Sequence, residues 1–173
     1  MKPEPSPADT LRRVIKVARF NGMIAVLPVA SFCALIALVM GDLIGAIVGL
    51  LVAAAGWIEW HGAKLLQRGQ ARGIDWLVRS QLYLLSIILL YVMRQMLSYD
   101  PEYVGSLITP DMNQMFQSAG LNVQQVMPMV RTFFYTMYGS FALIALFYQG
   151  GLALYYKRRA TTIRTALGKG GVV

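Results

Sequence analysis

Four long runs of apolar residues, separated by shorter polar stretches, form the main pattern of this chain. They cover, approximately, residues 20–40, 43–66, 74–97 and 129–156. A helix needs about 20 apolar residues to cross the roughly 30 Å hydrocarbon core of a bilayer, and each run meets that length. The pattern predicts an all-α integral membrane protein, a four-transmembrane-helix bundle that forms one membrane domain over residues 10–160.

The polar stretches predict how the first three spans are connected. Gly41-Asp42 is short enough for a tight outer turn, so spans one and two are expected to form an antiparallel hairpin. Residues 67–73 contain two glycines and two arginines and predict an inner turn. Pro28 is expected to kink the first span, because proline has no N–H group to donate within a helix.

The segment before the first span has two parts. Residues 1–9 contain three prolines and no apolar run, which predicts a disordered tail. A helix is then expected to begin at Leu11, capped by Asp9 or Thr10, with its apolar and basic residues on separate faces. Such a helix would lie on the inner membrane surface against anionic headgroups, and a basic pore vestibule is the alternative.

The connection over residues 98–128 is the longest in the chain and predicts a helix of its own. Thr-Pro-Asp at 109–111 has the cap, the first-turn proline and the acidic residue that are typical of a helix N-terminus. Apolar and polar positions then separate onto two faces. We therefore expect a short helix over about 110–119 in the outer interface, followed by a helix capped by Asn122 that leads into the fourth span.

The charges predict the orientation of the spans. The chain carries 16 Lys and Arg against 8 Asp and Glu, a formal net charge of +8. Thirteen of the basic residues flank helix ends predicted to share one side: Lys2, Arg12, Arg13, Lys16, Arg19, Lys64, Arg68, Arg72, Lys157, Arg158, Arg159, Arg164 and Lys169. This positive-inside pattern places both termini in the cytoplasm, in a bacterial inner membrane. It favours anionic lipid headgroups as partners of the termini, including a basic, mobile tail over 161–173, and disfavours nucleic acid.

A row of small residues runs along the second span. Gly41, Gly45, Gly49 and Ala53 recur at intervals of four, which places them on one helix face. Small residues let a second helix backbone approach closely in a membrane. This row is therefore a candidate packing seam, either within the bundle or between subunits of a homo-oligomer.

Polar residues inside the spans predict a polar layer near the inner boundary. Counting helical rise from the inner turn places Glu59 and Arg79 roughly 8–9 Å deep, so the two are expected to pair. Gln81 and Gln149 come out about 12 Å deep by the same count, close enough in depth for an interhelical hydrogen bond. These contacts either lock the bundle or belong to a water-filled path that binds an ion.

Two further residues are weaker candidates for that path. His61 follows Glu59 but falls almost at the interface, where a headgroup-level side chain is expected rather than a metal ligand or a proton relay. Asp42 lies in the outer turn. It is expected to be a solvated carboxylate, and a cation-attracting ring at a pore mouth is the alternative.

The composition excludes several kinds of chemistry for the lone chain. Cys33 is the single cysteine and His61 the single histidine. One chain can therefore form no intrachain disulfide, no cysteine-based zinc site and no bis-histidine haem site. The sequence shows neither a nucleophile–base set nor a carboxylate cluster of the metal-site type, so we expect no enzyme activity, no metal and no cofactor.

The function expected from these features is a homo-oligomeric channel or conduit for an ion or small solute. A non-catalytic accessory or scaffold subunit of a larger membrane complex is the alternative. A remote alternative is handling of Cu(I), for which thioether sulfur is a suitable soft ligand. It rests on the methionines of the outer third, which are Met93, Met96, Met112, Met115, Met127, Met129 and Met137.

Overall fold

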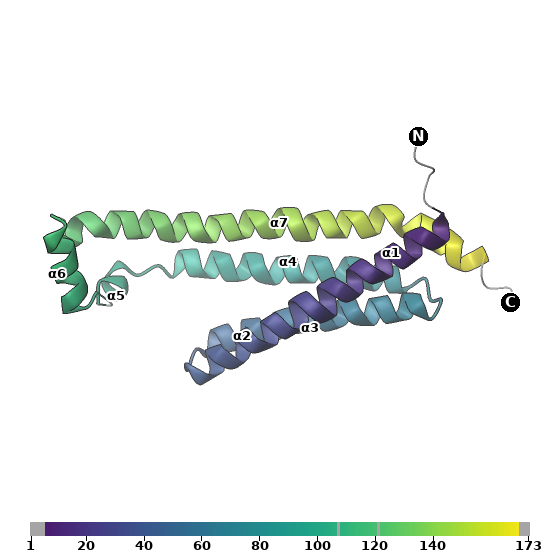
Figure 1. Cartoon of the computed structure of the whole chain (residues 1–173), viewed down its shortest axis with the longest axis horizontal. Coiled ribbons are helices and arrows are strands. Elements are labelled where there is room, and N and C mark those ends of the chain that lie inside the picture. The colour runs from purple at the N-terminus through teal and green to yellow at the C-terminus, as the bar shows by residue number, and fades with distance from the viewer. Residues whose placement is uncertain (1–5, 107, 121, 170–173) are drawn as a thin grey trace. The chain divides into compact units, whose positions relative to one another are not determined.

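The computed structural model describes residues 6–106, 108–120 and 122–169, and every element within those ranges is a helix (Figure 1). In chain order they are α1 (Pro7–Arg19), the π-helical η1 (Phe20–Val26), α2 (Leu27–Val39), α3 (Leu43–Gln67), α4 (Gly73–Leu97), α5 (Pro101–Ser106), α6 (Pro110–Ser118) and α7 (Val123–Lys169).

Four helical segments are long and apolar enough to cross a membrane. They are Pro7–Val39, which joins α1, η1 and α2, then Leu43–Gln67, Gly73–Leu97 and Val123–Gly168. This confirms the prediction of an all-helical membrane protein with four potential spans. The side of the membrane on which the termini lie stays a prediction.

The chain divides into two compact units. The first combines the chain up to Ile88 with the chain from Ala145 onward, and the second comprises Leu89–Ile144. Helices α4 and α7 each contribute to both units. The first unit contains all of α1, η1, α2 and α3 and holds most of the buried polar side chains.

The helix of the first span changes from α to π geometry just before Pro28, and the predicted kink stays a prediction. The Leu27 N–H donates to the carbonyl of Gly22, five residues earlier, where an α-helix would use a carbonyl four residues earlier. Pro28 cannot donate at all, so the regular ladder is broken at this point. The wider turn of η1 carries Asn21 to a buried position, with only 3% of the residue exposed.

Helices α2 and α3 form the expected hairpin (Figure 1). Small residues of α3 face α2 within it. A Cβ atom added at Gly49 would lie 2.7 Å from the Cβ of Ala34 on α2, so the two helices are in direct contact there. Gly45 also faces α2, and Ala53 is buried. Gly41 does not belong to this seam. It lies in the turn with a φ of 77°, a conformation that favours glycine.

The apolar core of the first unit lies where both terminal helices meet the α3–α4 turn. Val14 of α1, Leu66 of α3, Ile74 of α4 and Ile163 of α7 are each at most 1% exposed and belong to one cluster. Helix α1 and the C-terminal part of α7 pack against the same turn, so their basic residues lie at one end of this unit. We call this the basic end, and its residues are Arg12, Arg13, Lys16, Arg19, Lys157, Arg158, Arg159 and Arg164.

The terminal helices are longer than the sequence pattern predicts. Ser6, rather than Asp9 or Thr10, caps α1, and the helix begins at Pro7. Helix α7 continues to Lys169, where a mobile tail from residue 161 is expected, because Ile163 is buried in the core and Arg164 pairs with Asp75 at 3.0 Å. The remaining parts of the two predicted tails, 1–5 and 170–173, lie outside the described residues.

The second unit is built on aromatic contacts between the end of α4 and the first part of α7. The Phe134 ring contacts Tyr99 and Tyr138 in tilted geometry, at centroid distances of 5.0 and 4.7 Å. The Tyr135 hydroxyl donates to the Met96 carbonyl at 3.2 Å. The predicted helix over 110–119 is present as α6, with Thr109 as its cap. Asn122 caps α7 through its side-chain oxygen, as expected. The sequence pattern did not predict α5.

Candidate functional site

A cluster of buried polar side chains lies among all four spans of the first unit. Its members are each at most 3% exposed and form what we call the Glu59 cluster: Asn21, Glu59, Ser80, Gln81 and Tyr156. Asn21 comes from η1, Glu59 from α3, Ser80 and Gln81 from α4, and Tyr156 from α7. Polar side chains inside a span need hydrogen-bond partners, so the contacts within this cluster show which of its polar atoms are paired and which are not.

Both carboxyl oxygens of Glu59 accept hydrogen bonds from uncharged side chains. The Nδ2 of Asn21 donates to Oε2 at 2.7 Å, and the hydroxyl of Tyr156 donates to Oε1 at 2.8 Å. Glu59 is 1% exposed and Tyr156 is fully buried. The carboxyl is therefore held between two different spans by neutral donors.

A third hydrogen bond extends this cluster toward the surface of the helix bundle. The hydroxyl of Tyr148 on α7 donates to the Oδ1 of Asn21 at 3.1 Å, so Asn21 joins Tyr148 to Glu59. Tyr148 is 54% exposed. The result is a continuous hydrogen-bonded chain from an exposed tyrosine to a buried carboxyl.

The predicted pairing of Glu59 with Arg79 is wrong. The Arg79 side chain is exposed on α4, whereas the neighbouring Ser80 and Gln81 face the cluster. The ion pair found among the described side chains joins Asp75 and Arg164, and it involves neither Glu59 nor Arg79. Counting depth along each helix placed both residues at a similar level, but it could not give the direction in which Arg79 faces.

The predicted hydrogen bond between Gln81 and Gln149 is also not formed. Both residues are buried, as expected, but the Nε2 of Gln81 donates to the Ser80 hydroxyl at 3.4 Å, and the Gln81 side chain also interacts with Glu59. The Oε1 atoms of Gln81 and Gln149 have no hydrogen-bond partner among the described side chains and backbone. The Oε1 of Gln81 therefore leaves one acceptor in the Glu59 cluster without a donor.

A close crossing of two backbones places Asn21 within reach of Glu59. A Cβ atom added at Gly56 would lie 2.9 Å from the Gly22 carbonyl oxygen, and one added at Gly22 would lie 2.7 Å from the Gly56 carbonyl oxygen. Only glycine permits such an approach between η1 and α3. Gly22 follows Asn21 directly and Gly56 precedes Glu59 by about one turn, so the crossing brings Asn21 and Glu59 next to each other.

The remaining candidates from the sequence lie outside the cluster. The His61 ring stacks on Trp57 at 5.6 Å and meets the edge of Trp76 at 5.7 Å, which fits an aromatic site rather than a ligand position. Asp42 is exposed and caps α3, since its Oδ1 accepts from the Gly45 N–H at 2.9 Å. Neither contributes to the environment of Glu59.

Asn21 and Tyr156 are the functional candidates that sequence reasoning missed. Asn21 is a polar residue at the start of the first apolar run, which was a usable signal. Tyr156 precedes Lys157-Arg158-Arg159, so its position indicated an interfacial tyrosine rather than a buried one. Its burial depends on how α7 packs, which the sequence pattern does not give.

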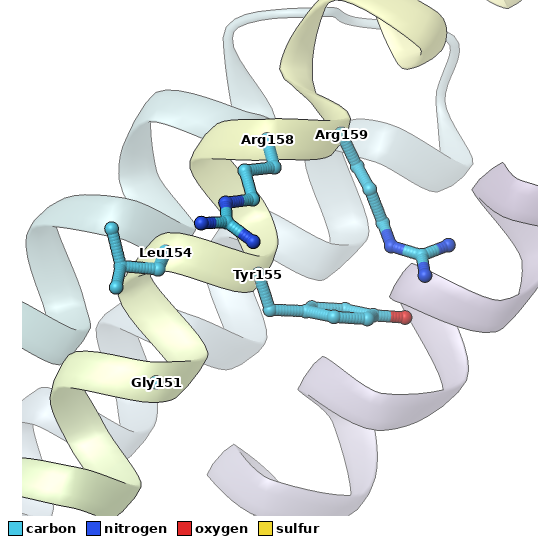
Figure 2. Close-up of a pocket in the computed structure, with 5 residues that line it drawn as sticks. All are labelled: Gly151, Leu154, Tyr155, Arg158 and Arg159. Atoms are coloured by element: carbon cyan, nitrogen blue, oxygen red, sulfur yellow. The ribbon is translucent and has the colours of Figure 1, made fainter.

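A second kind of site lies at the basic end, on the surface of α7. A pocket of about 530 Å³ is lined by Gly151, Leu154, Tyr155, Arg158 and Arg159. Figure 2 shows Arg159 beside the Tyr155 ring and Arg158 on the side of Leu154. The Arg159 guanidinium lies 4.4 Å from the centre of that ring, a cation–π contact. The pocket combines positive charge with apolar walls, and the ring already engages one of its two cations.

The structure adds little to the methionine hypothesis. The seven methionines of the predicted outer third all belong to the second unit. Met112 and Met115 lie on α6, which has no buried residue, and they are 42% and 70% exposed. Within the described part of the chain, no three His, Cys, Asp or Glu side chains gather as metal ligands. Binding of Cu(I) by methionine sulfur stays a prediction.

Comparison of the chain with protein-family models, with curated proteins and with solved structures found no match. We therefore infer the function from the Glu59 cluster itself.

Proposed function

We propose that this chain is a non-enzymatic membrane protein that conducts an ion, with the Glu59 cluster as its internal binding site for a proton or a small monovalent cation. The observation that carries the proposal is a carboxyl buried among four spans with neutral donors on both oxygens and no basic side chain paired with it in the described structure. A negative charge at membrane depth requires neutralisation, which a bound proton or cation provides.

The oxygen atoms around Glu59 fit this ligand class. The carboxyl and the unpartnered Oε1 atom of Gln81, whose side chain interacts with Glu59, offer hard oxygen ligands inside the first unit. Oxygen ligands of this kind replace the hydration shell of a cation, and a carbonyl oxygen also accepts the hydrogen of a protonated carboxyl. The Asn21 side chain joins Glu59 to the exposed Tyr148 through two hydrogen bonds. These hydrogen bonds can break and re-form when the ligand enters or leaves the Glu59 carboxyl.

A binding site within one chain is better supported than a path between subunits lined by Glu59, Arg79 and Asp42. Glu59 is buried inside the first unit, whereas Arg79 and Asp42 are both exposed and Asp42 serves as a helix cap. Self-assembly of the chain stays a prediction, and it is compatible with an ion site in each copy.

Flux through vesicles tests the proposal. The full chain is reconstituted into liposomes, and proton, Na⁺ and K⁺ movements are followed separately after a pH or concentration jump. We expect one of the three to move faster than in protein-free vesicles, and Glu59→Gln to remove that difference because the amide carries no charge to neutralise. Asp42→Asn removes an exposed carboxylate and is the matched control, expected to conduct like the wild type.

Three outcomes would contradict the proposal. They are wild-type flux in Glu59→Gln, an equal loss in Asp42→Asn, and no ion movement above protein-free vesicles for the wild type. Circular dichroism and elution from a size-exclusion column show whether each variant keeps its fold before its flux is compared.

A further inference from the structure

A groove of about 550 Å³ opens at the basic end, between the α1–η1 segment and the last turn of α3. One part of its lining is cationic and consists of Arg12, Lys16 and Arg19. Another part is apolar and consists of Phe20, Met23 and Ile24. The groove belongs entirely to the first unit and is separate from the Glu59 cluster.

The three cationic side chains share one face of α1. Their spacing of four and then three residues places them on neighbouring turns. Like charges at this spacing repel each other, and the groove lining contains no carboxylate that would offset the repulsion. An anionic ligand is the partner that this arrangement favours.

The apolar side chains continue the groove along the first span. Phe20, Met23 and Ile24 are 61%, 46% and 62% exposed. From Arg12 to Ile24 the chain rises by roughly 18 Å at helical spacing, so positive charge at one end gives way to apolar surface at the other. A soluble anion would leave the apolar part unused, whereas an acidic phospholipid would fill both parts.

We infer that this groove binds one acidic phospholipid, with the phosphate between Lys16 and Arg19, the rest of the headgroup toward Arg12, and an acyl chain along the apolar part. Gln67 of α3 also lines the groove. A bound lipid would therefore contact α3 as well as α1, which distinguishes a built site from general attraction of the basic end to an anionic surface.

The α7 pocket of Figure 2 is the nearest rival for such a lipid. It offers two arginines, Arg158 and Arg159, and the second lies over the Tyr155 ring. The groove offers three basic residues and a longer apolar part. We therefore place the tighter site in the groove.

Native mass spectrometry of the full-length protein tests the inference. The protein is released from detergent micelles after titration with dioleoyl-phosphatidylglycerol or dioleoyl-phosphatidylcholine. We expect one phosphatidylglycerol to bind in preference to phosphatidylcholine. Neutralising Arg12, Lys16 and Arg19 to Gln should weaken that binding by roughly fivefold for each residue, the usual effect of one basic side chain near an anionic lipid.

Two variants serve as matched controls. Arg13→Gln, Arg68→Gln and Lys157→Gln together remove the same charge from exposed positions that line neither pocket. Arg158→Gln with Arg159→Gln removes the rival pocket. We expect both control proteins to retain the tight phosphatidylglycerol site. In a separate competition experiment on the wild type, inorganic phosphate and glycerol phosphate should compete poorly with the intact lipid.

Several results would overturn the inference. They are equal weakening in the groove variant and the charge-matched control, a larger loss in the α7 variant, equal binding of the two lipids, and full competition by free phosphate. If the triple groove variant does not fold, Lys16→Gln with Arg19→Gln gives the same comparison with two charges removed. This outcome is independent of ion flux, so the lipid site and the Glu59 proposal can fail separately.

Discussion

Glu59 is held by one neutral donor on each carboxyl oxygen, Asn21 from the first span and Tyr156 from the fourth. A carboxylate among apolar residues is costly in lipid, so each of these hydrogen bonds should contribute to stability.

The first prediction concerns the hydroxyl of Tyr156. Tyr156→Phe keeps the buried ring but removes the donor to Oε1 of Glu59, leaving that oxygen with one fewer hydrogen bond. We expect a loss of about 1–3 kcal/mol in the free energy of unfolding, measured by denaturation in detergent micelles.

Tyr155→Phe is the control for this prediction. Tyr155 is the adjacent tyrosine, and in the described structure its contacts are made by the ring, to Tyr156 and Arg159. The Tyr155→Phe protein should unfold within about 0.5 kcal/mol of the wild type. Equal effects of the two substitutions would show that the Tyr156 hydroxyl contributes nothing specific to the cluster.

The need of Glu59 for a partner could be predicted from the sequence, but the identity of the partner could not. A carboxylate among apolar residues is costly in lipid, which indicated that Glu59 is paired. Arg79 lies at a similar predicted depth but is exposed, and the neutral donors Asn21 and Tyr156 take its place. The direction in which a side chain faces depends on how the helices pack, which depth along a helix does not give.

At the scale of elements, the approach of η1 to α3 determines whether the cluster can form. The sequence identified small residues on the second span, and the contact of Gly49 with Ala34 places part of that row against α2. The crossing of Gly22 and Gly56 could not be predicted from the row, since Gly22 lies on another element. The π-helical turn before Pro28 was equally unpredictable, because proline dictates an interruption but not its geometry.

The second prediction concerns this crossing. Gly56→Ala would place a Cβ atom 2.9 Å from two backbone atoms, the carbonyl oxygen of Gly22 and the nitrogen of Leu27. Backbone atoms cannot move aside as a flexible side chain can, so we expect a loss of about 1–3 kcal/mol in the free energy of unfolding. We also expect weaker ion flux, because Asn21 moves away from Glu59.

Gly150→Ala is the control for the crossing. A Cβ atom added there meets nothing within 4 Å, and alanine favours a helix more than glycine does. The Gly150→Ala protein should be at least as stable as the wild type. A stable Gly56→Ala protein with normal flux would show that η1 and α3 do not need this close approach.

At the scale of the whole molecule, four potential spans and the gathering of basic residues follow from the sequence. Helix lengths and apolar runs agree to within a few residues for the second and third spans. The extent of α7 does not follow from the sequence, because its last turns have few apolar residues and are helical through contacts such as that of Ile163 with the core. The residue at which α7 ends therefore depends on packing between segments that are distant in the sequence.

The third prediction concerns orientation. In a Cys33→Ser background, Ser6→Cys on the N-terminal side and Thr162→Cys on the C-terminal side should react with a membrane-impermeant maleimide only after cells are opened. Ser118→Cys, between the third and fourth spans, should react in intact cells. This follows from the positive-inside rule applied to four spans. Labelling of Ser6→Cys in intact cells would contradict the N-in, C-in orientation.

The central claim is that Glu59 binds the conducted ion rather than only holding the helices together. The most direct test is ion flux in liposomes for the wild type and Glu59→Gln, measured beside the thermal unfolding of the same two proteins. We predict flux in the wild type, its loss in Glu59→Gln, and a folded variant whose stability falls by no more than about the 1–3 kcal/mol expected for one changed hydrogen bond. A folded Glu59→Gln protein that conducts like the wild type, or a wild type that conducts no ion, would contradict the claim and leave the Glu59 cluster with a structural role.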